Sequence, residues 1–369
     1  MLAIFSFILI LSFLVIIHEL GHFLAAKWTK VGVEEFGLGY PPKLVRLFHW
    51  WGVDFTLNLI PFGGFVRLQG EEKDLDDKLV AGDYKAAGLW QRLIVILAGA
   101  GVNFLFGILI FALIFTKIGI PTEINTARIG QVAPDSPAAK AGITANWEIK
   151  EVKVGGQTFT ITNPEDVIKL VKQHQGQDVA LTLVGPCQGL SCKNQTKEVQ
   201  VYIRQPDETP EGQGAIGLVF EPVIYVHYPF WQMPFRGMWV GTKQAFALSL
   251  MILEALKNMV NQLFTHGQLS EELAGPVGIV HQAQSSGLFS QGFLAILSFT
   301  AMLSINLAIM NVLPIPPLDG GRAVLAISEV ALGKKITEKL EYYLNYGGWV
   351  MIMLLILAIT ARDVWRIFR

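Results

Sequence analysis

The sequence has few charged residues and almost no net charge. Asp, Glu, Lys and Arg make up 16% of its 369 residues, whereas a soluble domain carries about a quarter. Hydrophobic residues make up 52%, and the mean hydropathy is +0.44. The formal charge of −1 leaves no surplus of basic residues for binding nucleic acid. The composition therefore predicts a protein of the lipid bilayer with some soluble part and no nucleic-acid partner.

Cysteine is also scarce. The two cysteines, Cys187 and Cys192, are too few for a disulfide-stapled fold, and their spacing matches no common zinc motif. These two thiols would form a disulfide only if their region lies outside the cytoplasm. The alternative is a pair of unpaired thiols on the protein surface.

Long apolar runs are abundant, and the first one carries a chemical motif. Residues 2–26 are almost all apolar but include the sequence His18-Glu19-Leu20-Gly21-His22. Two histidines four residues apart lie on the same face of a helix, where both imidazoles can bind one zinc ion with Glu19 beside them as a general base. Ionisable residues inside a membrane-length run are costly and are functional by default. The motif therefore predicts a zinc site within the bilayer, with a chance match of buried core histidines as the alternative.

A cleaved signal peptide is the competing interpretation of this first run. No basic region precedes the run, and the run is longer than the apolar part of a signal peptide. Lys27 and Lys30 follow it and mark its cytoplasmic end. We therefore expect a first transmembrane helix whose amino terminus lies outside the cytoplasm.

The region after this run changes to short strand-like segments. Residues 35–42 are rich in turn-forming residues, whereas 44–48 and 53–60 alternate polar and apolar positions with the period of strands. Residues 61–68 add a turn and a further strand, and 71–88 are charged and loop-like. An exposed strand edge here could hold an extended peptide by β-addition. An ordinary cytoplasmic hairpin is the alternative.

The second apolar run covers residues 92–118 and contains small residues and one amide. The small residues of the stretch Ala98-Gly99-Ala100-Gly101 allow helices to approach closely, and Asn103 can form a hydrogen bond to another helix. We expect Asn103 to serve in helix packing, with a direct catalytic role as the alternative.

Residues 122–222 are the most polar third of the chain. Helical spacing over residues 164–173 and a loop followed by a short helix at 133–143 accompany several strand-like segments. The pattern predicts a small β-rich domain with two helices. Its expected strands are 127–132, 149–154, 158–161, 179–184 and 198–203.

The segment from Met238 to Phe264 is ambiguous. It is apolar enough to resemble a span, but it contains Lys243, Glu254 and Lys257, which helical spacing gathers mostly on one face. We expect amphipathic helices that lie on the membrane surface. A further transmembrane span is the alternative.

The third apolar run, residues 292–313, ends at a series of prolines. Pro314, Pro316 and Pro317 cannot continue a helix, and broken backbone at membrane depth is tolerated only where it is buried or lines a cavity. Asp319 follows this break and could be the third zinc ligand, with the fourth position left for water. A loop aspartate that caps the next helix is the alternative.

The last apolar run covers residues 347–361. Lys334, Lys335 and Lys339 precede it and mark a cytoplasmic loop. A fifth span at 238–260 would place Asp319 and the two histidines on opposite sides of the membrane. We therefore expect four spans and a metal site toward the cytoplasmic side.

Three motifs stand out along the chain: His18-Glu19-Leu20-Gly21-His22, Ser136-Pro137-Ala138-Ala139-x-Ala141-Gly142 and Asn311-x-x-Pro314-x-Pro316-x-Leu318-Asp319-Gly320. Together they resemble the site-2 proteases, of the bacterial regulator of sigma-E protease type. The resemblance covers essentially the whole chain and implies a single PDZ domain, where the best-known bacterial members have two. The chain departs from the family at Gly99-Ala100, where a Gly-Pro is usual, and at Asn146-Trp147, where Gly-Asp is usual in the PDZ domain.

The resemblance implies an intramembrane zinc metalloprotease that acts in regulated intramembrane proteolysis. It assigns Zn²⁺ to three ligands, His18, His22 and Asp319, and the role of base to Glu19. It assigns contacts with unwound substrate to Asn311, Pro314 and Pro316, although the prolines could equally be structural. The strands after the first span would form a membrane-associated β-sheet that presents the substrate.

The expected substrates are single-pass membrane proteins, such as an anti-sigma factor or remnant signal peptides. The chain would be a multi-pass protein of the inner or plasma membrane, with its PDZ-like domain outside the cytoplasm. Two other functions remain open. One is a non-proteolytic membrane receptor whose PDZ-like domain binds envelope peptides, and the other is a metal transporter.

The predicted fold class is an α-helical polytopic membrane protein with about four transmembrane helices, a membrane-associated β-sheet and one inserted PDZ-like β-rich domain. The expected organisation follows the chain in seven segments. They are transmembrane helix one (1–30), the β-hairpin region and a cytoplasmic loop (31–90), helix two (91–120), the PDZ-like domain (122–222), the interfacial helices (223–290), helix three with its proline motif (291–323), and a cytoplasmic loop with helix four (324–369).

Overall fold

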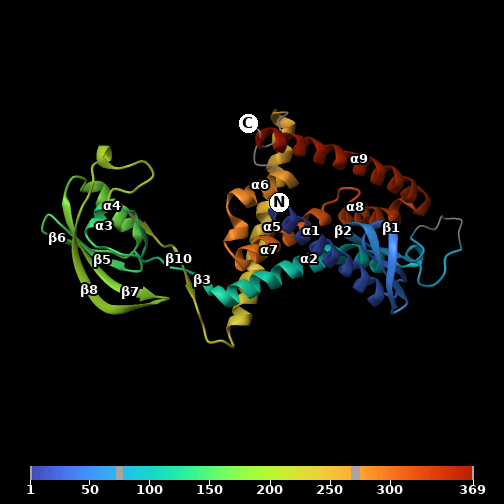
Figure 1. The fold of residues 1–369 in the computed structure, drawn as a ribbon, viewed down its shortest axis with the longest axis horizontal. Coiled ribbons are helices and arrows are strands. Elements are labelled where there is room, and N and C mark those ends of the chain that lie inside the picture. Colours follow the sequence, from blue (N-terminus) through green and yellow to red (C-terminus); the bar gives the residue numbers. More distant parts are fainter. Residues whose placement is uncertain (1, 72–77, 267–274, 368–369) are drawn as a thin grey trace. The chain divides into compact units, whose positions relative to one another are not determined.

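The computed structural model describes residues 2–71, 78–266 and 275–367. It divides into two compact units (Figure 1). The first, called the membrane unit here, contains residues 1–114 and 238–369. The second, called the inserted unit, contains residues 115–237.

Four helices in the described part of the chain are long and apolar enough to cross a membrane: α1 (Leu2–Trp28), α2 (Leu89–Ile118), α7 (Phe293–Val312) and α9 (Lys334–Ile367). The expected number of about four transmembrane helices therefore agrees with the structure. In α9 the apolar stretch is Lys339–Asp363. The alternative of a further span at 238–260 is not supported, because α5 (Met233–His266) is not among these helices.

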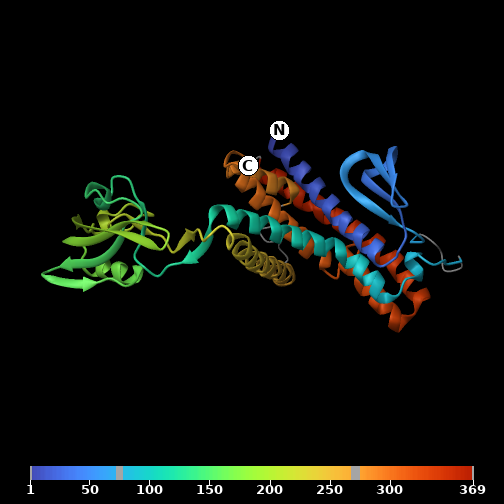
Figure 2. The ribbon, with the colours of Figure 1, turned by 90° about the horizontal axis from the view of Figure 1, so that it is seen from below.

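Gly21 lets α1 and α2 approach closely near the histidines, where the two helices lie beside each other (Figure 2). A β-carbon at Gly21 would lie 2.5 Å from the carbonyl oxygen of Ala98, so any larger residue would push the two helices apart. The small residues of the second apolar run thus act as the sequence predicts. Their close packing fixes where the α1 histidines lie relative to α2.

The sheet of the membrane unit is a long, bent hairpin of β1 (Val33–Trp50) and β2 (Val53–Leu68). The first half of β1 pairs with both halves of β2, since Phe36 lies opposite both Phe55 and Val66. The hairpin therefore forms a sheet of four short strand segments, and β2 residues 64–68 lie along one edge. The expectation of turns at 35–42 was wrong, because the buried segment that includes Phe36 packs against α1 as a strand and the glycines and prolines only bend it.

The expected loop at 71–88 is only partly described. Residues 72–77 lie outside the described part, and Tyr84–Ala86 forms a single 3₁₀ turn, η1. Tyr84 is buried and its backbone N–H donates to the carbonyl of Gln69, so this segment returns to the end of β2.

The inserted unit is β-rich with two helices, as expected. Its main sheet has the order β6-β5-β7-β8, with α3 and α4 contributing to the core on one face (Figure 1). The helix expected at 164–173 is α4, which begins with a capping box between Asn163 and Asp166. The elements are β3 (Ile120–Glu123), β4 (Ile129–Val132), α3 (Pro137–Lys140), β5 (Glu148–Val154), β6 (Gln157–Thr160), α4 (Pro164–Gln173), β7 (Asp178–Gln188), β8 (Ser191–Tyr202), η2 (Pro206–Glu208), β9 (Leu218–Phe220) and β10 (Val223–Val226).

Two short strand pairs and a disulfide in this unit were not settled by the sequence. Strand β3 pairs with β10 and β4 pairs with β9, so both ends of the insert are tied together. Cys187 and Cys192 form a disulfide across the end of the β7–β8 hairpin. The two strand pairs join residues far apart in sequence, and the disulfide depends on the geometry of the hairpin tip. Local sequence patterns encode neither.

The segment expected to form interfacial amphipathic helices is helical from Met233 onward in its described part. Its first helix is α5, of 34 residues, which crosses α2 (Figure 1). It packs there through Gly241, where an added β-carbon would lie 2.8 Å from the backbone nitrogen of Ala112. Shorter helices follow: α6 (Pro276–Ser285) and η3 (Leu288–Ser290).

The loop expected after residue 323 is helical. Helix α8 (Asp319–Leu332) fills most of this region, and α9 begins at Lys334. Ala323, Leu325 and Ala326 are buried, and this apolar face against the membrane unit explains why a helix forms where charged residues suggested a loop.

Candidate metal centre and active site

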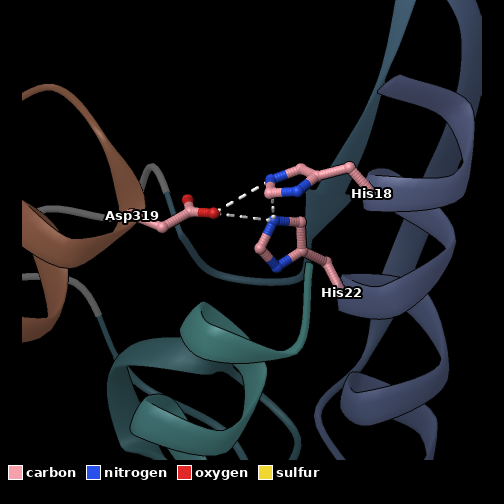
Figure 3. Close-up of side chains that lie close together, drawn as sticks. All are labelled: His18, His22 and Asp319. Atoms are coloured by element: carbon pink, nitrogen blue, oxygen red, sulfur yellow. Dashed lines mark hydrogen bonds and ion pairs between the residues drawn. The ribbon is translucent and has the colours of Figure 1, made fainter. Parts of the chain in front are cut away.

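Two histidines of α1 and an aspartate at the start of α8 meet at one point (Figure 3). The Nε2 atom of His18 lies 2.9 Å from Oδ2 of Asp319, and Nε2 of His22 lies 3.3 Å from the same oxygen. The two Nε2 atoms are 3.1 Å apart. The structure thus brings Asp319 to the two histidines, although about 300 positions of the sequence separate it from them.

A tight turn between α7 and α8 places Asp319. Helix α7 ends at Val312, and α8 begins at Asp319 itself. A β-carbon at Gly320 would lie 2.1 Å from the carbonyl oxygen of Val312, and one at Gly321 would lie 2.6 Å from the backbone nitrogen of Pro316. Only glycine permits this approach, so the two glycines after Asp319 explain how the broken helix folds back to the site.

Helix α2 holds the other side of the histidines. Nδ1 of His22 lies 2.8 Å from the carbonyl oxygen of Val95. A carbonyl can only accept, so His22 carries its proton on Nδ1 and directs the lone pair of Nε2 toward His18 and Asp319. No sequence pattern predicts this contact, because its acceptor is a backbone carbonyl on another helix.

Gly99 of α2 is the second feature that sequence reasoning did not connect to the site. A β-carbon there would lie 2.5 Å from Nε2 of His22 and 2.7 Å from Nε2 of His18. The backbone of α2 therefore forms one wall of the candidate metal centre. The run of small residues is the sequence signal for this wall, although on its own it predicts only helix packing.

The donor atoms fit a zinc ion. Two imidazole nitrogens and a carboxylate oxygen are a common catalytic ligand set. Ligands at ~2.0–2.1 Å in a tetrahedron are ~3.3 Å from one another, close to the separations of 2.9, 3.1 and 3.3 Å among these three atoms. Oδ2 of Asp319 is buried and, among the residues described, receives no hydrogen bond. Converging acceptor atoms of this kind are stabilised by a cation.

Glu19 lies beside these atoms in a cavity of about 190 Å³. The cavity reaches from α1 to the edge segment of β2, where Gly64 faces Glu19: a β-carbon at Gly64 would lie 3.7 Å from Cγ of Glu19. The carboxylate thus stands between the candidate metal ligands and a strand edge. The lining residues are His18, Glu19, His22, Phe65, Val66, Leu68, Glu71, Tyr84, Val95, Ile96, Asp319 and Arg322.

A second, larger cavity of about 810 Å³ adjoins the first, since Glu71, Tyr84 and Arg322 line both. Arg322 forms an ion pair with Glu71 at this boundary. Burial alone would lower the pKa of Arg322, but Glu71 and other acceptors raise it above its usual range, so the guanidinium stays charged. Burial raises the pKa of Tyr84 to about 12, which keeps its phenol neutral at physiological pH. We call this cavity the polar vestibule.

The other residues expected at the site precede Asp319, at the end of α7 and in the turn that follows it. Asn311 is in the last turn of α7, and Pro314 and Pro316 belong to the connection before α8. Of the cavity residues in the described part, none is Asn311, Pro314 or Pro316. The structure therefore does not bring these three into the cavity that holds Glu19.

Comparison with known proteins identifies the family. The model of peptidase family M50 matches residues 6–355. The chain is 29% identical over 372 residues to "Putative zinc metalloprotease RC0203" of Rickettsia conorii, with all of both chains covered. It is 27% identical to "Zinc metalloprotease RasP" of Oceanobacillus iheyensis and 26% identical to "Probable protease eep" of Enterococcus faecalis, again over the full length of both.

The family match confirms the zinc metalloprotease that the His18–His22 motif and the Asp319 motif suggested. It spans nearly the whole chain, and it joins a structure with four helices of membrane-spanning length among its described residues. The expectation of a membrane metalloprotease is thereby confirmed at the level of the family. The chain belongs to peptidase family M50.

Proposed function

We propose that this peptidase hydrolyses peptide bonds within transmembrane segments of other membrane proteins, with zinc held by His18, His22 and Asp319 and with Glu19 as the general base. The observation that carries the proposal is the convergence of three ligand atoms within 3.3 Å of one another. Two of them come from the interior of a helix with membrane-spanning character. A hydrolytic site at that depth is suited to substrates that are themselves in the membrane.

The chemistry follows from the donor set and from Glu19. Zinc in such a site supplies a water of lowered pKa and polarises the scissile carbonyl. Glu19 would take a proton from the attacking water and deliver it to the leaving amine. The hydrogen bond from His22 to Val95 and the turn at Gly320 hold the ligand atoms in register.

The substrate must unwind before its carbonyls can be attacked. We propose that β2 residues 64–68 receive the extended segment by β-addition. In the described chain these residues pair on one side only, with β1, and Phe65 and Val66 line the cavity beside Glu19. Asn311, Pro314 and Pro316 would contact the substrate as it enters, a role that the family resemblance implies.

Water must also reach a site that lies within the bilayer. We propose that the polar vestibule supplies it. Charged side chains line this cavity, among them Arg92, Arg322 and Glu341, and it meets the active-site cavity at the Arg322–Glu71 pair. Since Lys334 also lines the vestibule, the positive-inside trend puts it, and the active site, on the cytoplasmic side.

The inserted unit would then lie outside the cytoplasm. A disulfide between Cys187 and Cys192 favours an oxidising compartment. The loop Ser136–Gly142 forms the short helix α3 with Ser136 as its cap, as in the PDZ signature that the sequence resembles. We propose a PDZ-like domain that engages or filters substrates such as anti-sigma factors or remnant signal peptides in regulated intramembrane proteolysis.

Replacing Glu19 with Gln tests the proposal. The purified Glu19→Gln protein should retain its zinc but lose cleavage of a single-pass substrate by at least about 100-fold, because a neutral amide cannot take the water proton. A Glu34→Gln variant, which changes a carboxylate in β1 away from the cavity, is the matched control. Cleavage sites are located by mass spectrometry, with and without a chelator.

Three outcomes would contradict the proposal: activity retained in Glu19→Gln, cleavage that a chelator does not block, or cleavage only in soluble segments. A chain that binds envelope peptides without cutting them would instead support the receptor function. No metal transport is expected in vesicles, because the described spans other than α1 contain no further cluster of histidine, cysteine or carboxylate ligands.

A further inference from the structure

Asn103 is an unusual residue for the middle of a membrane-spanning helix. Its side chain is 0% exposed, and neither Nδ2 nor Oδ1 has a hydrogen-bond partner within the described chain. A buried amide without partners is costly in water-free surroundings and is rare in native structures. Packing alone, the role expected from the sequence, does not explain such a group.

The position of Asn103 is fixed by its neighbours on the same face of α2. Gly99, one turn earlier, faces His18, and the ring of Phe106, one turn later, contacts Phe13 of α1 with centroids 5.8 Å apart. Asn103 therefore lies opposite the turn of α1 that ends at His18. On the side of α2 that faces α7, the hydroxyl of Ser304 donates to the backbone carbonyl of Asn103 at 2.7 Å.

One ring nitrogen of His18 also lacks a hydrogen-bond partner among the described residues. Its Nδ1 is buried and, in the part of the chain that the structure describes, has no hydrogen-bond partner. Cε1 and Nε2 of His18 would each lie only 2.7 Å from a β-carbon at Gly99. The Cε1–Nε2 edge of the ring therefore faces α2, and Nδ1 is bonded to Cε1 next to that edge. His22 differs, because its Nδ1 donates to Val95. Histidines that bind metal through Nε2 almost always donate their other N–H to an acceptor.

We propose that Asn103 is the positioning residue for His18: its Oδ1 accepts a hydrogen bond from the Nδ1–H of His18, directly or through one water molecule. The inference rests on the proposed function, since it concerns the metal-bound form of the site. An amide has an acceptor oxygen that is free to turn about two bonds, and Oδ1 of Asn103 is otherwise unused. This hydrogen bond would fix the tautomer that directs Nε2 of His18 toward Asp319 and would give both histidines an equivalent support from α2.

The test compares variants that differ in their ability to accept. Asn103→Leu keeps the volume but removes the acceptor, and Asn103→Asp keeps an acceptor at the same reach. Zinc dissociation constants are measured by competition with a chelator on the full-length protein, together with thermal unfolding of the metal-free form. We expect zinc binding to weaken ~10–100-fold in Asn103→Leu, as for other second partners of metal-binding histidines, and to be retained in Asn103→Asp.

A purely structural role predicts the opposite order. A carboxylate buried between apolar helices would disturb the packing more than leucine, so Asn103→Asp would then bind zinc more weakly than Asn103→Leu. That order, or a zinc affinity in Asn103→Leu equal to the wild type, overturns the inference. Ser304→Ala is the matched control, because it disturbs the same contact of α2 with α7 without removing the acceptor. It should lower thermal stability and leave zinc affinity unchanged.

Two further measurements keep the result clear. If Asn103→Leu does not fold, Asn103→Ala carries the same expectation, because it also lacks an acceptor. Absorption of the Co²⁺-substituted protein reports ligand geometry without activity, and its ligand-field bands should shift in both variants that lack the acceptor and not in Asn103→Asp. A wild-type protein that binds no zinc would overturn the proposed function itself, which separates that failure from failure of the role of Asn103.

Discussion

At the scale of single residues, glycines determine whether the site can form. The helix backbones approach so closely at Gly99 that the imidazoles of His18 and His22 occupy the space of a side chain. Gly320 and Gly321 do the same for the turn that carries Asp319. The ligands are therefore placed by residues that offer no chemistry of their own.

A pair of glycines in α2 makes this argument testable. Gly99→Ala would place a methyl group 2.5 Å from Nε2 of His22, whereas a β-carbon at Gly101 would have no heavy atom within 4 Å. Both changes raise helix propensity by up to ~1 kcal/mol. We expect Gly99→Ala to weaken zinc binding and proteolysis at least ~10-fold, and Gly101→Ala to leave both unchanged and to raise the melting temperature slightly.

The measurements are zinc content after dialysis and the rate of cleavage of one membrane substrate. Equal losses in the two variants would mean that helix packing in general, and not the wall at Gly99, controls the site. No loss in Gly99→Ala would show that the imidazoles can move aside.

At the scale of elements, α8 holds its place through ion pairs as well as apolar contacts. Arg92 of α2 and Glu329 of α8 lie 2.6 Å apart, with side chains 13% and 14% exposed. Arg322 of α8 pairs with Glu71 beyond the end of β2. Because Asp319 is the first residue of α8, these contacts fix the helix that supplies the third ligand.

Removing one partner of this partly buried pair should therefore disturb both stability and the site. Glu329→Gln leaves the Arg92 guanidinium without its counter-charge, and we expect a loss of ~1–3 kcal/mol in unfolding free energy, with a lower zinc affinity. The matched control is Glu198→Gln, which breaks the exposed Lys153–Glu198 pair of the inserted unit and should cost less than ~1 kcal/mol.

Chemical unfolding in detergent and chelator competition measure the two effects. If Glu329→Gln changed unfolding but not zinc affinity, α8 would be held at Asp319 by the Gly320 turn alone. If neither changed, the Arg92–Glu329 pair would have no structural role.

At the scale of the whole molecule, the proposed four-span topology has a consequence that can be tested. The inserted unit follows α2 and precedes the spans α7 and α9, and Lys334 near the vestibule precedes the last span. If the amino terminus is outside, as proposed, Lys334 would face the cytoplasm and the disulfide of Cys187 and Cys192 would lie in an oxidising compartment.

Thiol labelling of intact cells checks this arrangement. After treatment with a membrane-impermeant reductant, Cys187 and Cys192 should react with an impermeant maleimide. In a variant with both cysteines replaced by serine and Lys334→Cys added, labelling should require permeabilised cells. Labelling of Lys334→Cys in intact cells would contradict the four-span topology.

Local sequence patterns were enough to predict the lipid bilayer, the spacing of the two histidines and the family. Long apolar runs predict a bilayer, and they can be recognised from consecutive residues alone. The spacing of His18 and His22 required only the geometry of one helix. The helix of the inserted unit at 164–173 was likewise predicted correctly, since its capping box and periodicity are local.

Tertiary structure decided whatever depends on residues far apart in sequence. Burial against α1 overrode the local turn signals at 35–42, and burial against the rest of the membrane unit made the region after 323 helical. The meeting of Asp319 with the histidines, the wall at Gly99 and the carbonyl of Val95 against His22 exist only once α1, α2 and α8 are packed together. The three candidate ligands can be predicted from sequence motifs, whereas the groups that support each ligand come from contacts between helices.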